Sequence, residues 1–115
     1  MSKTNKDLDI ISHILEYCSE IEQTIEHFGN SLEIFSSNKI YRNAITMCIL
    51  QIGELAGRLS PEFISSHSNV PWRSIKAMRN IVAHAYGSIS IPDAWDTITN
   101  DIPVLKAYCI KILDR

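Results

Sequence analysis

Residues 41–60, YRNAITMCILQIGELAGRLS, carry the pattern that decides the fold. Apolar side chains recur there at steps of three and four residues, which is the spacing of one face of an α-helix. They are Tyr41, Ile45, Cys48, Ile52, Leu55 and Leu59. Ser60 and Pro61 follow, and this pair suits a new helix start because serine caps it and proline fits its first turn. The stretch predicts a long amphipathic helix followed by a short one.

The segments before and after it show the same spacing. The N-terminal stripe, which Gly29 can end, consists of Leu8, Ile11, Leu15, Cys18, Ile21, Ile25 and Phe28. The C-terminal stripe begins after Ser90, whose spacing to Asp93 is that of a capping box. Its members are Ile91, Trp95, Ile98, Ile102, Leu105, Cys109 and Ile112. Pro103 lies inside this helix and is expected to kink it.

A further long helix is expected to begin at Pro71, because residues 72–86 contain no helix breaker before Gly87. Residues 32–35, LEIF, are compatible with a brief extended piece, and no convincing strand pattern appears elsewhere. The sequence therefore predicts an all-α fold, an up-and-down helical bundle of four long helices plus a short one. Residues 1–115 are expected to form one domain.

Composition supports a folded domain of this kind. The chain has 115 residues, of which 45% are hydrophobic and 21% charged, enough apolar surface for a core. No stretch approaches the roughly 18 apolar residues of a membrane span, and the first residues lack a signal peptide's apolar core. The three cysteines are far apart, which predicts free thiols in a reducing, cytoplasmic setting. No metal-ligand spacing appears, so neither a metal nor another cofactor is expected.

The charge is distributed unevenly along the chain. The formal net charge of −2 argues against a uniformly basic nucleic-acid binder. Residues 1–54, however, carry a net −4 and residues 93–115 a net −1, whereas residues 55–92 carry +3. A positive segment in an acidic chain fits a phosphate-handling site, although four basic residues could also be scatter. A nucleic acid held by so small a positive segment should show a shallow salt dependence.

Two glycines interrupt the helix predicted over residues 41–59. Gly53 and Gly57 each weaken a helix interior by about 1 kcal/mol relative to alanine, so each needs a structural reason. The close approach of another backbone is such a reason. That backbone belongs either to a neighbouring helix or to a second copy of the chain.

Residues 78–87, MRNIVAHAYG, gather the side chains that can bind phosphate or move protons. On a straight helix Asn80 and His84 share one face and Arg79 and Tyr86 another, with Arg79 and His84 about 140° apart at 100° per residue. They do not converge from one helix alone. A second copy across a two-fold axis, or a local distortion of the helix, would bring them together.

Each of these residues also has a purely structural interpretation. Arg79 can pair with a surface acid, and His84 can interact with the C-terminal end of its helix dipole. Tyr86 can be a core residue with its hydroxyl at the rim. Spacing alone leaves both interpretations open.

Three landmarks in order carry a resemblance to a known family: IGELAGRLSPE at 52–62, VPWR at 70–73 and RNIVAHAY at 79–86. Together with residues 95–105 they resemble the HepT-like branch of the HEPN superfamily over essentially the whole chain. The resemblance implies a homodimeric, metal-independent endoribonuclease, the toxin of a type VII-like toxin–antitoxin system. It also implies an antitoxin partner, a minimal nucleotidyltransferase that attaches AMP to the motif tyrosine.

By position, this resemblance makes Arg79 and His84 the catalytic pair, Asn80 the polar residue after the arginine, and Tyr86 the site of AMPylation. The other basic residues of the +3 segment are expected to support RNA binding; they are Arg58, Arg73 and Lys76. The expected partners are RNA, a second copy and the nucleotidyltransferase, with no membrane. The alternative is a non-enzymatic nucleotide-binding or nucleotidyltransferase-docking helical module, because a fold can persist without its activity.

Overall fold

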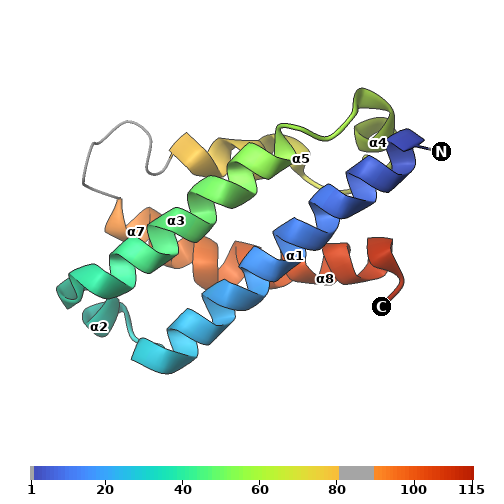
Figure 1. Cartoon of the computed structure of the whole chain (residues 1–115). Coiled ribbons are helices and arrows are strands. Elements are labelled where there is room, and N and C mark those ends of the chain that lie inside the picture. Colours follow the sequence, from blue (N-terminus) through green and yellow to red (C-terminus); the bar gives the residue numbers. More distant parts are fainter. Residues whose placement is uncertain (1, 81–89) are drawn as a thin grey trace.

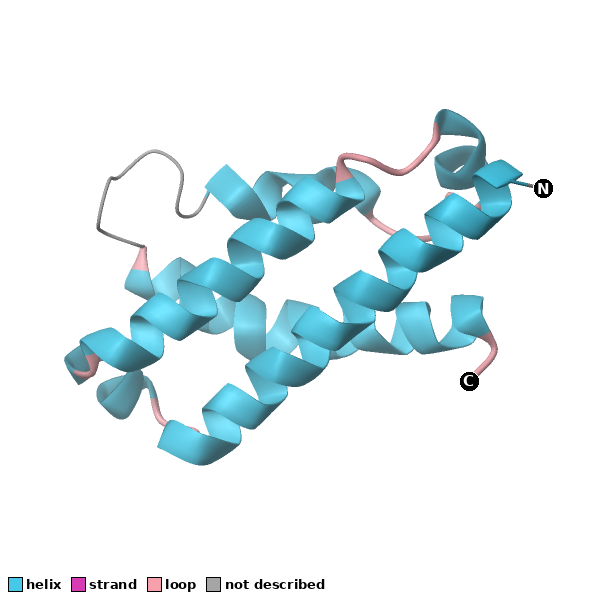
Figure 2. Ribbon diagram, in the orientation of Figure 1, coloured by secondary structure: helices cyan, strands magenta, loops and turns pink. Residues whose placement is uncertain are grey.

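The computed structural model describes residues 2–80 and 90–115, and every regular element in these ranges is helical (Figures 1 and 2). The expected all-α fold is confirmed. The α-helices are α1 (Ser2–Phe28), α2 (Leu32–Ser37), α3 (Lys39–Ala56), α4 (Pro61–Ser66), α5 (Trp72–Lys76), α7 (Ile91–Asp96) and α8 (Ile102–Leu113). Two short helical turns of other types lie between these helices. The 3-10 turn η1 (Ala77–Arg79) winds more tightly than an α-helix, and the π-helical turn η2 (Thr97–Asp101) winds more widely.

The core lies where α1 packs against α3 and α8. In Figure 1, α1 and α3 run side by side and α8 passes behind α1. The predicted stripes meet there, and their fully buried members include Ile11, Cys18, Ile45, Ile52, Ile102 and Cys109. Burial of these apolar side chains is the main favourable term in folding the bundle. None of the described helices is long and apolar enough to span a lipid bilayer.

Capping side chains set several of the helix ends. Gly29 ends the N-terminal helix with a φ of +124°, a left-handed conformation that favours glycine. Asn38 accepts a hydrogen bond from the Tyr41 N–H (3.0 Å) at the start of α3. Ser60 accepts one from the Phe63 N–H (3.1 Å) at the start of α4, with Pro61 in the first position. The helix end predicted at Gly29 and the helix start predicted at Ser60 and Pro61 are confirmed.

The expectation of an extended piece at residues 32–35 is wrong. These residues begin α2, because the Ser31 hydroxyl caps the helix by accepting a hydrogen bond from the Ile34 N–H (3.3 Å). Phe35 is thereby buried, with its ring centroid 5.0 Å from that of Tyr41 and 5.3 Å from that of Trp95. A short helix places this one large side chain in the core.

The helix expected from Pro71 is not a single regular α-helix. It begins at Trp72, and after Lys76 the chain winds as the 3-10 turn η1 to Arg79. The buried side chains here are Trp72, Ile75 and Met78, at steps of three. Trp72 and Ile75 lie in α5 and only Met78 lies in η1, where three residues per turn keep it on the same side as Ile75. Residues 81–86 of the predicted helix lie outside the described residues.

The C-terminal helix is disturbed near Pro103, and the disturbance takes the form of a π-helical turn. Pro103 lacks an N–H group, so it cannot donate to the carbonyl four residues earlier. The turn η2 lies just before it, and proline then occupies the first turn of α8.

The expected capping box at Ser90 and Asp93 does not form, because the Ser90 side chain makes no hydrogen bond to the backbone of α7. Ser90 Oγ instead donates to the Asp93 carboxylate at 2.8 Å.

Candidate functional site

Arg79 lies where η1 packs against α3. A Cβ atom built on Gly53 of α3 would lie 3.1 Å from both the N and the Cβ atoms of Arg79, and 3.4 Å from the Lys76 carbonyl oxygen. The two backbones approach this closely because residue 53 has no side chain. The expected close approach at Gly53 is therefore confirmed, and it is a contact within one chain. The expectation that Gly57 lies in a helix interior is wrong, because Gly57 is the C-cap residue that follows α3. A Cβ atom there would meet only the carbonyls of Glu54 and Gly53.

A pocket of about 360 Å³ opens at this contact. Its lining consists of Gly53, Gly57, Lys76, Ala77, Arg79 and Asn80. The structure thus brings together three of the predicted site residues, Lys76, Arg79 and Asn80, and all three are exposed. The two cations can attract a phosphate, and the Asn80 amide can donate a hydrogen bond to it.

Glu54 supplies the negative charge at this pocket. Its Oε1 atom accepts a hydrogen bond from Nη1 of Arg79 at 2.8 Å, and the side chains of Arg79 and Glu54 are 53% and 41% exposed. An ion pair this exposed contributes about 0–1 kcal/mol to stability. The interpretation that Arg79 pairs with a surface acid is thus confirmed. The arginine can still bind a phosphate, because this contact joins only Nη1 to the carboxylate and a guanidinium has five N–H donors.

The remaining predicted residues do not line this pocket. Arg58 and Arg73 are exposed on the surface outside it, and His84 and Tyr86 lie outside the described residues. The angles derived for a straight α-helix do not hold at Arg79, because η1 turns by about 120° per residue instead of 100°.

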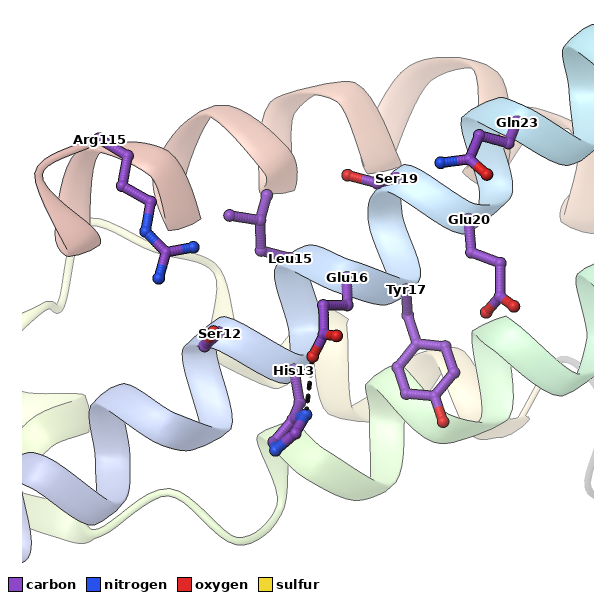
Figure 3. Close-up of a pocket in the computed structure, with 9 residues that line it drawn as sticks. All are labelled: Ser12, His13, Leu15, Glu16, Tyr17, Ser19, Glu20, Gln23 and Arg115. Atoms are coloured by element: carbon purple, nitrogen blue, oxygen red, sulfur yellow. Dashed lines mark hydrogen bonds and ion pairs between the residues drawn. The ribbon is translucent and has the colours of Figure 1, made fainter.

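A larger groove of about 690 Å³ runs along α1, and it has a different character (Figure 3). The carboxylates of Glu16 and Glu20 line it together with His13 and Arg115, and His13 Nδ1 lies 2.9 Å from Glu16 Oε1. Carboxylates repel a phosphate backbone. The smaller pocket beside Arg79 is therefore the candidate site for a polyanion.

Sequence reasoning missed the part that Glu54 plays in this site. Residues 52–54 served there only as a landmark, and 25 positions separate Glu54 from Arg79. No local spacing rule connects positions so far apart. The one usable signal was the glycine in the helix interior, which marks where another backbone approaches, and the acid directly after it.

The three cysteines behave as small apolar core residues, as expected. Cys18, Cys48 and Cys109 are free thiols and all are buried. Burial raises the pKa of Cys48 and of Cys109 to about 12 each, and it raises the pKa of Cys18 as well. Among the described residues, no three His, Cys, Asp or Glu side chains gather as metal ligands.

Comparison with known proteins identifies a family that the chain resembles. The family described as "Ribonuclease HepT-like" matches residues 14–112. "Putative RNase TTE0752" of Caldanaerobacter subterraneus is 31% identical over 91% of this chain and 92% of its own length. "Probable ribonuclease HepT" of Thermococcus cleftensis is 31% identical over 97% of this chain and 98% of its own length. No solved structure matches the chain significantly.

Proposed function

The chain belongs to the HepT-like ribonuclease family of the HEPN superfamily, and from that premise we propose that it is a metal-independent endoribonuclease, the toxin of a toxin–antitoxin pair. The observation that carries the proposal is the position of Arg79. It lies at a pocket with Lys76 and Asn80, inside the region that matches the family. The pocket supplies positive charge for a phosphate in a chain whose net charge is negative.

The proposed reaction is transesterification at one RNA phosphate. A base removes the proton of a 2′-hydroxyl, the 2′-oxygen bonds to the adjacent phosphorus, and the bond from phosphorus to the 5′-oxygen breaks. An acid returns a proton to the leaving 5′-oxygen, which leaves a 2′,3′-cyclic phosphate and a 5′-hydroxyl. An imidazole can gain or lose a proton near neutral pH, so His84 serves as base or acid, and Arg79 stabilises the added negative charge at phosphorus.

The other basic residues hold the RNA on either side of the reacting phosphate. Lys76 lines the pocket with Arg79, and so does the neutral amide of Asn80. Both side chains therefore bind the reacting phosphate or the next one. Arg58 and Arg73 are exposed outside the pocket and contact the RNA backbone further along the strand.

The whole chain, residues 1–115, acts as one domain, and the described helices share one buried apolar cluster.

We further propose that two copies form the active unit through the outer face of α3. Ile40 and Met47 are 70% and 55% exposed, and Glu54 follows after another seven residues. Steps of seven return to nearly the same side of a helix, within about 20°. The outer face of α3 therefore leads from exposed apolar side chains to the pocket of Arg79. A second copy on that face supplies the second acid–base group that the reaction needs.

Regulation follows from the same site. We propose that a small nucleotidyltransferase partner attaches AMP to Tyr86: the tyrosyl oxygen bonds to the α-phosphorus of ATP, pyrophosphate leaves, and the hydroxyl proton is lost. The modification adds an anion and the volume of a nucleotide seven positions after Arg79 in the sequence, and we propose that it blocks RNA by charge and by size. Intact mass after co-expression with the partner should rise by one or more AMP units. The assignment is wrong if Tyr86→Phe gains the same mass.

Cleavage of RNA in the presence of EDTA tests the function directly. The folded wild-type protein should cut RNA to products with cyclic phosphate ends, and Arg79→Ala and His84→Ala should each lose about a hundredfold or more in rate. Arg115→Ala, which removes an arginine from the groove on α1, is the matched control and should retain wild-type activity.

Equal cleavage by wild type, Arg79→Ala and His84→Ala would overturn the proposal, as would the absence of cleavage by folded wild type. In the latter case, retained affinity for a nucleotide or for the nucleotidyltransferase would establish the alternative, a non-enzymatic binding module.

A further inference from the structure

We propose that Glu54 is a positioning residue for Arg79: it holds the arginine side chain in the orientation that meets the reacting phosphate. The inference rests on the proposed function, since it assigns Glu54 a role through Arg79. Glu54 lies outside the motif of residues 79–86, and the reaction proposed above gives it no part. The geometry of α3 and η1 points to it.

The first observation is that α3 holds Arg79 at two points with consecutive residues. Gly53 lets the backbone of Arg79 approach to where a Cβ atom at residue 53 would be 3.1 Å from the Arg79 N and Cβ atoms. Glu54 then binds the far end of the same side chain, with Oε1 2.8 Å from Nη1. An arginine side chain that is held at its tip by such a hydrogen bond samples fewer rotamers than a free one. The guanidinium thus enters the reaction already oriented.

The second observation is that the contact uses only part of the guanidinium. The hydrogen bond joins a single atom pair, Nη1 and Oε1, whereas a guanidinium has five N–H donors. Most donors therefore remain for a phosphate while Glu54 stays bound. Arg79 and Asn80 line the same pocket, so these donors lie at the site where a phosphate would bind.

The third observation concerns exposure. Both side chains are about half exposed, so the pair contributes little to the stability of the fold. An acid beside a phosphate-binding arginine also opposes the phosphate by its charge. A role in orientation accounts for Glu54 despite that repulsion, because an oriented donor loses less rotamer freedom when the phosphate binds.

Substitutions at Glu54 that change either the length or the charge of its side chain test the proposal. Glu54→Gln keeps an oxygen acceptor at the same distance along the side chain but removes the charge, whereas Glu54→Asp keeps the charge but falls short by one methylene. If Glu54 orients Arg79, kcat on RNA should fall in the order wild type, Gln, Asp, Ala. We expect Glu54→Ala to lower kcat about tenfold with KM changed less than about threefold, and Gln to stay within about threefold of wild type.

The matched control is Glu16→Ala on α1. Glu16 is likewise an exposed carboxylate paired with a basic side chain, His13, but it lies in the groove away from Arg79. This variant should cleave RNA as the wild type does. Thermal unfolding of every variant should stay close to that of the wild type, since the pairs removed are exposed.

A binding measurement keeps the inference testable without catalysis. A 2′-O-methyl oligoribonucleotide of mixed sequence cannot be cleaved, so its affinity reports binding alone. Comparison with the Arg79→Ala background isolates the part of that affinity that depends on Arg79. We expect Glu54→Ala to weaken binding about threefold in the wild-type background and not at all in the Arg79→Ala background.

The outcomes are distinct. The positioning role is overturned if Glu54→Ala cleaves or binds as well as wild type or better, if Asp outperforms Gln, or if Glu54→Ala weakens binding equally without Arg79. If folded wild type cuts no RNA, the proposed function fails, and the binding comparison alone decides whether Glu54 orients Arg79.

Discussion

The backbone of Arg79 rests against Gly53, so that a methyl group at residue 53 would lie 3.1 Å from both the N and the Cβ atoms of Arg79. This contact sets the distance between η1 and α3. It also fixes where the Arg79 side chain begins, on the edge of the pocket that Lys76 and Asn80 line. The geometry of the proposed site therefore depends on the absence of a side chain in the adjacent helix.

Gly53→Ala tests this dependence. The added methyl group must push η1 outward by a few tenths of an ångström, and the displaced Arg79 should lower RNA cleavage by about tenfold. Alanine normally stabilises a helix interior by about 1 kcal/mol over glycine, but here the clash should cancel that gain. Cleavage rate and thermal unfolding measure the two effects.

Gly57→Ala is the matched comparison for stability. A Cβ atom there would lie 3.4 and 3.6 Å from two carbonyl oxygens, which is ordinary contact distance. Gly57→Ala should therefore unfold at a higher temperature than Gly53→Ala. A Gly53→Ala variant with full activity and higher stability would show that the contact with η1 does not position Arg79.

The helical stripes were predictable from sequence because each depends on local periodicity alone. Ile45 and Ile52 on α3, and Ile102 and Cys109 on α8, are buried as their spacing predicts. Local winding was less predictable. Nothing in the sequence of residues 72–79 excludes a regular α-helix, yet the winding changes from α5 to the 3-10 turn η1 after Lys76. Buried side chains at steps of three fit either winding, so their spacing does not choose between the two.

The candidate site also has a part that local sequence predicts and a part that it does not. A local motif and a local excess of positive charge pointed to Arg79, Lys76 and Asn80, which the structure brings to one pocket. The Glu54–Arg79 pair depends on how η1 packs on α3, and tertiary packing has no signature in the spacing of residues 25 positions apart. Such a contact becomes visible only once the helices are placed together.

A second long-range contact fixes the N-terminal helix to the start of α4. Asp7 is only 4% exposed, and its carboxylate accepts hydrogen bonds from the N–H (2.9 Å) and the hydroxyl (2.7 Å) of Ser60. Asp7→Ala leaves both Ser60 donors without this partner and should cost about 1–3 kcal/mol in the free energy of unfolding. Asp9→Ala removes an exposed acid two residues away and should cost less than about 0.5 kcal/mol. Urea unfolding of the two variants should differ accordingly; equal stabilities would mean that the Asp7 contact contributes nothing.

The proposed dimer predicts the effect of a charge on the outer face of α3. Met47 is 55% exposed, so Met47→Asp should leave the monomer folded, yet it places a carboxylate where the second copy docks. We expect this variant to be monomeric by sedimentation and to lose most RNA cleavage. Val104→Asp, at a similarly exposed apolar residue on α8, should remain dimeric. If Met47→Asp stays dimeric and active, the interface lies elsewhere.

The buried thiols predict how stability and labelling depend on pH. Burial raises the pKa of Cys48 and Cys109 to about 12 each, and a hydrogen bond from Cys48 Sγ to the Glu20 carboxylate (3.4 Å) adds to the shift at Cys48. An unfolded thiol has a pKa of about 8.5, so the folded chain holds these protons more tightly. The thiols therefore cost no stability below that pH. Above it the free energy of unfolding should fall as pH rises, by at most about 1.4 kcal/mol per thiol and pH unit.

Iodoacetamide labelling at pH 8 measures the same property. The native protein should label far more slowly than a free thiol, and all three cysteines should react once urea unfolds the chain, because only the thiolate is nucleophilic. Cys48→Ala should reduce the loss of stability between pH 8 and pH 10, since one thiol no longer titrates in the unfolded chain. Rapid labelling of the native protein, or a stability that rises over this range, would show that these thiols are neither buried nor raised in pKa.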